Sequence, residues 1–193
     1  MKIDKPTSAI FDREKIKQDL QALLDQPPPA ELPPCPNCER HIPNDCTSSC
    51  PSAHESLSSE PKKHPLEKKV VPLVFELAST GAFQTCWSCE GHADSEGRLW
   101  RIPQISFYAG SPVYAQLLLK YINNLDNEKK LSYSWRVCVS DYGPLNGLTY
   151  NLEPNLNFLT DPHIGKLQQD LIALSTKLFE NLQTLARSML DKV

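Results

Sequence analysis

Two cysteines and a histidine stand close together in the middle of the chain, in the stretch Cys86-Trp87-Ser88-Cys89-Glu90-Gly91-His92. Thiolate sulfur and imidazole nitrogen are typical zinc ligands in proteins. Three protein ligands with a free coordination position form the arrangement of a catalytic zinc, where an acid can act as general base for bound water. The stretch therefore predicts a metal site with Glu90 and His92 as candidate catalytic residues. The alternative is a purely structural loop, in which Glu90 caps a turn and Gly91 supplies a positive φ.

Four more cysteines lie earlier in the chain with the spacing Cys-x2-Cys-x7-Cys-x3-Cys. Four thiolates at such short spacing can close a tetrahedral zinc site within one loop. The metal ligands that we predict are therefore Cys35, Cys38, Cys46, Cys50, Cys86 and Cys89.

Two ways of sharing these ligands fit the spacing equally well. In one, Cys35 and Cys38 join Cys86 and Cys89 in a clamp that resembles a zinc ribbon. In the other, the four N-terminal cysteines hold one ion, and the second cysteine pair forms a separate open site with His92. Zinc is the predicted cofactor, and an iron–sulfur cluster held by four cysteines is the alternative.

Length, charge and the N-terminus restrict the class of protein. The chain has 193 residues and a formal net charge of -3, which argues against a strongly basic nucleic-acid binder. The first residues lack the apolar run of a signal peptide, and no stretch approaches the ~20 apolar residues of a membrane helix. These features predict a cytoplasmic protein. Thiols stay reduced there, so clustered cysteines indicate metal rather than disulfides.

Composition divides the chain into three segments. Residues 1–29 form a helical arm, with a helix predicted over 13–26 that Pro27-Pro28-Pro29 terminates. Residues 30–65 are rich in proline, serine and cysteine, and they contain too few aliphatic residues to fold without a bound metal. Residues 66–193 carry the helical and strand periodicities of a core domain.

The core domain is predicted to be α+β. Hydrophobic periodicity predicts helices over 66–80, 111–126 and 162–193, and strands over 82–87, 99–108, 131–140 and 148–153. This order favours a small antiparallel or mixed sheet of about four strands with helices on one side. The regular apolar spacing of the last helix indicates packing across the sheet, and a homodimer through this C-terminal helix is the alternative.

The residues Ser88-Cys89-x-Gly91, placed after a helix and a strand, are similar to the Ser-Cys-Ser-Gly-Arg motif of the wybutosine-synthesis methyltransferase family, which modifies tRNA. The order of elements over residues 66–153 also resembles that family. His92 stands where the motif has arginine, and Glu90 where it has serine. The resemblance implies methylation of tRNA with AdoMet as the methyl donor.

Two functions follow from the sequence. The first is a zinc-stabilised binding or regulatory module whose partner is a protein or an RNA, because the four-cysteine block lies beside a domain without a phosphate loop. The second is an enzyme that acts through the Cys86–His92 loop, in the manner of an RNA-modifying methyltransferase.

Overall fold

The computed structural model describes residues 12–32, 34–35, 39, 66–142, 148–158 and 161–193. Its helices are α1 (Arg13–Leu24), α2 (Val71–Ser79), α3 (Pro112–Asn127), α4 (Ile164–Ser175) and α5 (Leu178–Leu190), with a 3-10 turn η2 (Leu156–Phe158). Its strands are β1 (Phe83–Cys89), β2 (His92–Ala93), β3 (Leu99–Arg101), β4 (Gln104–Ala109), β5 (Trp135–Tyr142) and β6 (Leu148–Pro154). The predicted ligands Cys38, Cys46 and Cys50 lie outside the described residues.

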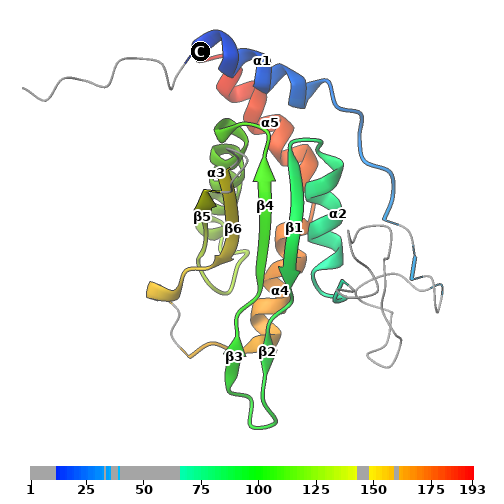
Figure 1. The fold of residues 1–193 in the computed structure, drawn as a ribbon, viewed down its shortest axis with the longest axis vertical. Coiled ribbons are helices and arrows are strands. Elements are labelled where there is room, and N and C mark those ends of the chain that lie inside the picture. The colour runs from blue at the N-terminus through cyan, green and yellow to red at the C-terminus, as the bar shows by residue number, and fades with distance from the viewer. Residues whose placement is uncertain (1–11, 33, 36–38, 40–65, 143–147, 159–160) are drawn as a thin grey trace, which may run out of the picture.

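The four long strands form one antiparallel sheet in the order β1-β4-β6-β5. Helices lie behind this sheet, and the opposite face of the sheet is turned toward the viewer in Figure 1. The α+β class and the antiparallel sheet of four strands are thus confirmed. β1 pairs with β4, and β5 pairs with β6, as two antiparallel hairpins. The pairing of β4 with β6, which joins the hairpins into one sheet, was not predicted.

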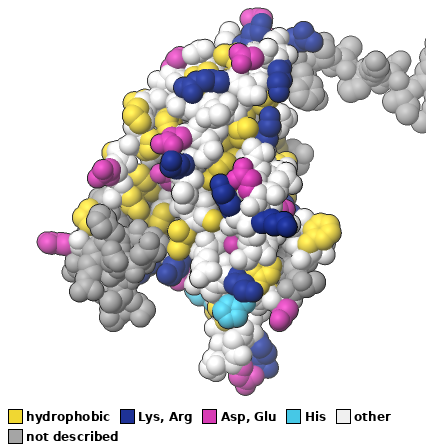
Figure 2. Space-filling model, turned by 180° about the vertical axis from the view of Figure 1, so that it is seen from behind, with side chains coloured by type: hydrophobic (Ala, Val, Ile, Leu, Met, Phe, Trp, Pro, Cys, Tyr) yellow, Lys and Arg dark blue, Asp and Glu magenta, His cyan; other side chains and the backbone are white. Residues whose placement is uncertain are grey.

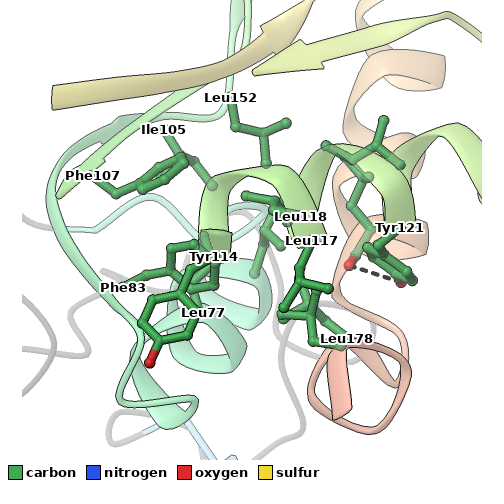
Figure 3. Packing of buried hydrophobic residues seen from close by; sticks show 14 of the residues in the cluster. Leu77, Phe83, Ile105, Phe107, Tyr114, Leu117, Leu118, Tyr121, Leu152 and Leu178 are labelled. Atoms are coloured by element: carbon green, nitrogen blue, oxygen red, sulfur yellow. Dashed lines mark hydrogen bonds between the residues drawn. The ribbon is translucent and has the colours of Figure 1, made fainter. Parts of the chain in front are cut away.

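The core lies between the sheet and the helices. Ile105 of β4 pairs with Leu152 of β6, and both side chains are fully buried. Figure 3 shows them beside Leu117 and Leu118 of α3, with Leu178 of α5 on the far side of that helix. Full burial of such a side chain stabilises a fold by about 1.5–3 kcal/mol. This apolar layer therefore holds the helices on one face of the sheet.

The strand predicted over 99–108 is divided in two. Proline has no amide hydrogen for a strand ladder, and Pro103 separates β3 from β4. β3 pairs with β2 instead, and the two form a short ribbon that extends from the lower end of the sheet in Figure 1. His92 pairs with Arg101 in this ribbon.

The helix predicted over 66–80 begins later, at Val71. Pro72 occupies its first turn, where the missing amide hydrogen costs nothing. Residues 68–70 form a turn before it. Glu67 therefore precedes the helix.

The single helix predicted over 162–193 is wrong, because the structure breaks it between α4 and α5. The Tyr121 hydroxyl of α3 donates to the carbonyl oxygens of Leu174 (3.2 Å) and Thr176 (3.0 Å). Lys177 then takes a left-handed conformation with φ 54°. Apolar residues on both sides of the break are fully buried; they are Leu167, Leu171, Leu174, Leu178 and Leu182. α4 contacts α2, and α5 contacts α1, α2 and α3. Packing of these helices across the sheet stays a prediction. A homodimer stays an untested prediction.

A carboxylate from another helix caps the N-terminus of α5. Lys177 gives this helix no side-chain cap, but the Glu76 carboxylate of α2 accepts a hydrogen bond from the amide of Phe179 (3.4 Å). Burial raises the pKa of Glu76, and the bond from Phe179 opposes that shift. Glu76→Ala should therefore lower the free energy of unfolding by about 1 kcal/mol, as losing a helix cap does.

Chemical denaturation would measure the effect of the Glu76 substitution. Glu76→Gln keeps an acceptor oxygen and should cost less than Glu76→Ala. Glu31→Ala, at an exposed position outside the helices, serves as the control. Equal free energies of unfolding for Glu76→Ala and Glu31→Ala would contradict a capping role.

Charges on the helix-covered side are mixed in sign. Figure 2 shows Lys and Arg side chains interspersed with Asp and Glu side chains over this side. Among the described helices, none has both the length and the apolar character needed to cross a membrane.

Candidate metal centre

Two segments that are distant in sequence meet at the lower end of β1. The amide of Glu90 donates to Glu67 Oε2 (2.6 Å), and the amide of Lys69 donates to Glu90 Oε2 (2.7 Å). Each acid thus accepts from the backbone of the opposite segment. This reciprocal pair of bonds holds the turn before α2 against the loop between β1 and β2.

Three potential metal ligands converge at this junction. One ligand atom each from Glu67, Cys89 and His92 lies within 4.8 Å of the other two. The carboxylate oxygen Oε1 of Glu67 is 2.9 Å from Nε2 of His92. Cys89 is buried with 4% exposure, whereas the side chains of Glu67 and His92 are about one-third exposed. The group therefore combines a buried sulfur with two ligands that solvent can reach.

Neighbouring groups act on the Cys89 thiol in opposite directions. Burial raises the pKa of Cys89, and the charge of Glu67 raises it further. The amide of Gly91 donates to the Cys89 sulfur at 3.4 Å and, with the charge of Arg101, lowers that pKa. The Gly91 amide stabilises the Cys89 thiolate in part, and a bound cation would stabilise it much more strongly.

Gly91 is the residue that allows the loop to turn. Its φ is 82°, a conformation that residues with a side chain rarely adopt. A Cβ atom at this position would lie 2.7 Å from Pro103 Cδ and 2.8 Å from Ile164 Cδ1. Both the backbone conformation and the close approach of two neighbours thus require glycine between Cys89 and His92.

The carboxylate of Glu90 forms a hydrogen bond that gives this residue a structural role. The Glu90 carboxylate accepts a hydrogen bond from the Lys69 amide. The Glu90 carbonyl oxygen accepts another from Gln168 Nε2 of α4 (3.4 Å). Burial raises the pKa of Glu90, and the bond from Lys69 opposes the shift. This agrees with the alternative in which Glu90 caps a turn. The catalytic roles of Glu90 and His92 stay predictions.

The structure brings some of the predicted ligands together and separates others. Cys89 and His92 belong to the group, whereas Cys86 does not. Cys86 is exposed and lies at a register shift in the pairing of β1 with β4, between Thr85 and Trp87. Cys35 is buried and is not a member of the group either.

Glu67 is the ligand candidate that sequence reasoning missed. It lies 22 positions before Cys89, at the start of a predicted helix, and no spacing rule connects the two residues. Only the packing of the turn before α2 against the end of β1 brings its carboxylate to the site. A search for acids immediately before the helices that border β1 would have included it.

Comparisons with protein-family models, with curated proteins and with solved structures found no match. The resemblance of Ser88-Cys89-x-Gly91 to the wybutosine-synthesis methyltransferases therefore stays a prediction.

Proposed function

We propose that the protein is a zinc-stabilised binding module that holds one Zn²⁺ through Glu67, Cys89 and His92. The observation that carries the proposal is the convergence of three ligand atoms from two segments within 4.8 Å. Around a tetrahedral zinc ion, ligand atoms lie ~3.5 Å apart, so the side chains need only a small contraction to bind it.

The chemistry of the three ligands favours zinc over the iron–sulfur alternative. A thiolate, an imidazole and a carboxylate are all common zinc ligands, whereas iron–sulfur clusters are held mainly by cysteine thiolates. The surroundings also fit the ion. Glu67 Oε2 is oriented by the Glu90 amide, and the Cys89 sulfur receives the Gly91 amide. Such outer contacts hold metal ligands in position and tune their basicity.

Zinc at this junction would contribute to folding, because the metal links the turn before α2 to the loop after β1. Binding free energy at a site that forms only in the folded chain is also folding free energy. The four-cysteine block is proposed to hold zinc as well, and only Cys35 of that block is described. A metal-stabilised junction on a small α+β domain supports a module whose partner is a protein or an RNA.

Zinc titration of ligand variants tests the proposal. Cys89→Ser, His92→Ala and Glu67→Gln should each weaken zinc binding by more than the about 10- to 100-fold typical of losing an outer contact. The measurement is competition between the apoprotein and a chromophoric chelator. Cys138→Ser is the matched control, because the Cys138 sulfur contacts Asn151 and Glu153 on the sheet. Cobalt substitution would add a thiolate-to-metal absorption band that Cys89→Ser removes.

A second comparison separates the two ways of sharing ligands. With two independent ions, Cys35→Ser and Cys89→Ser should remove different equivalents of zinc, and the double variant should lose both. With one shared clamp, both single variants remove the same equivalent. Unchanged zinc content and affinity in the Cys89→Ser, His92→Ala and Glu67→Gln variants would show that the proposed site is wrong.

A further inference from the structure

An exposed tryptophan projects from the ribbon beside the proposed metal centre. Trp100 is 65% exposed, yet its ring is held in a fixed orientation. It stacks on the imidazole of His92, with ring centroids 4.9 Å apart and an angle of 15° between the planes. One flat face of the indole is thus supported from within the protein, while most of the residue stays open to solvent.

The neighbouring residue provides a cation next to a second indole. The Arg101 guanidinium lies 4.8 Å from the centre of the Trp87 ring. Trp87 pairs with Ser106, which places it on the sheet face opposite the buried Ile105. Tyr108 shares that face and is 41% exposed. The helices lie on the other side of the sheet, as Figure 1 shows.

The charges of the ribbon leave Arg101 available for an anion. Asp94 and Glu96 are both paired with Arg98, at 2.8 and 3.2 Å. Arg101 forms no ion pair with any residue that the structure describes, and its side chain is exposed at the surface. The acids of the ribbon are thus compensated locally, although the whole chain carries a charge of -3.

We propose that Trp87, Trp100, Arg101 and Tyr108 form a stacking surface for single-stranded nucleic acid. The exposed rings of Trp100 and Tyr108 and the half-buried ring of Trp87 can stack on the flat faces of bases. The Arg101 guanidinium beside Trp87 fits the phosphate that each nucleotide carries. Stacking accepts every base, so the surface binds without strong sequence preference. Neither Trp100 nor Arg101 is a proposed metal ligand, and the inference therefore goes beyond the zinc site.

Binding of labelled oligonucleotides to the full chain tests the stacking surface. Fluorescence anisotropy with oligo(dT) and oligo(rU) of about 12 nucleotides at low salt should show binding of both polymers. Trp100→Ala should weaken binding by about tenfold, as expected for the loss of one stacked base. The affinity of Trp100→Phe for the oligonucleotides should lie between those of wild type and Trp100→Ala, because phenylalanine keeps a smaller aromatic face. Arg101→Gln should reduce the slope of log affinity against log salt by about 0.7, the value for one phosphate contact with a single strand.

Phe158→Ala is the control for the loss of an exposed aromatic residue. Phe158 is 69% exposed on η2, which directly follows β6 in the chain. Its removal should leave affinity unchanged. Absence of binding to both polymers, Trp100→Ala binding as tightly as wild type, or equal loss in Phe158→Ala would each overturn the proposal. Thermal unfolding of every variant checks the fold, and if Trp100→Ala does not fold, Trp100→Phe and Arg101→Gln carry the test.

Discussion

Replacing Gly91 by alanine should lower the free energy of unfolding by about 2–5 kcal/mol and weaken zinc binding. The left-handed conformation costs a residue with a Cβ about 1–2 kcal/mol. Overpacking against Pro103 and Ile164, at 2.7 and 2.8 Å, adds about 1–3 kcal/mol. Relief of that clash would shift the loop that places Cys89 and His92, so affinity for the metal should fall together with stability.

The matched control for this substitution lies in the same part of the chain. Gly97 has a φ of 83°, almost equal to that of Gly91, but a Cβ at that position would have no neighbouring atom within 4 Å. Gly97→Ala should therefore show the cost of the conformation alone, about 1–2 kcal/mol, with normal zinc affinity. Chemical denaturation and zinc competition measure the two effects. Similar results for both variants would mean that the contacts of Gly91 with Pro103 and Ile164 are unimportant.

Replacing Asp170 by alanine should have a comparable effect on stability, for a different reason. The carboxylate of Asp170 is buried and accepts from the amides of Ser132 (2.7 Å) and Tyr133 (3.1 Å). It also accepts from the indole nitrogen of Trp135 (3.0 Å). Each donor left without a partner in a buried site costs about 1–3 kcal/mol. The variant should lose about 3–5 kcal/mol, which lowers the unfolding midpoint by about 10 °C in a chain of this size.

Two further variants make the role of Asp170 specific. Asp170→Asn keeps one carbonyl oxygen as an acceptor and should lie between wild type and Asp170→Ala. Asp126→Ala removes an exposed carboxylate whose one side-chain hydrogen bond among the described residues comes from the Ser134 hydroxyl, and it should change stability by less than about 0.5 kcal/mol. Thermal unfolding followed by tryptophan fluorescence would report both the midpoint and the environment of Trp135. A midpoint for Asp170→Ala within about 2 °C of wild type would contradict the argument.

His92 is a proposed zinc ligand that stacks on Trp100 of the proposed stacking surface, and separate variants distinguish the two sites. Loss of zinc binding in Cys89→Ser with normal oligonucleotide binding would support two independent functions. Loss of both in the same variant would indicate that the metal orients the ribbon through His92. Trp100→Ala also tests whether the two sites depend on each other, because it removes the ring that stacks on His92 but leaves all three proposed metal ligands in place.

Local sequence patterns determined the elements of the core. Alternation of apolar and polar residues predicted the strand over 131–140, and the structure has β5 over Trp135–Tyr142. The helix predicted over 111–126 is α3 (Pro112–Asn127), and the hydroxyl of its N-cap Ser111 accepts from the amide of Val113. These signals are local, since they depend on side-chain period and on capping between residues a few positions apart.

The break within the last predicted helix accompanies contacts from elsewhere in the fold. The apolar spacing of the last helix continues across Thr176 and Lys177, so periodicity could not reveal the break. The break accompanies two carbonyl oxygens that bond to Tyr121, a residue more than 50 positions earlier. Glu76 then binds the new helix start from another part of the chain.

The candidate metal site was determined partly by sequence and partly by tertiary structure. The spacing of Cys89 and His92 around Gly91 indicated by itself that a thiol and an imidazole could meet, because one glycine allows the backbone to reverse between them. The third ligand could not be read from the sequence. Glu67 reaches the site because α2 lies against β1, and the register shift beside Cys86 in β1 was likewise not visible in the residue spacing. Ligand type is a property of the local sequence, whereas convergence of ligands distant in the chain is decided by how the elements pack.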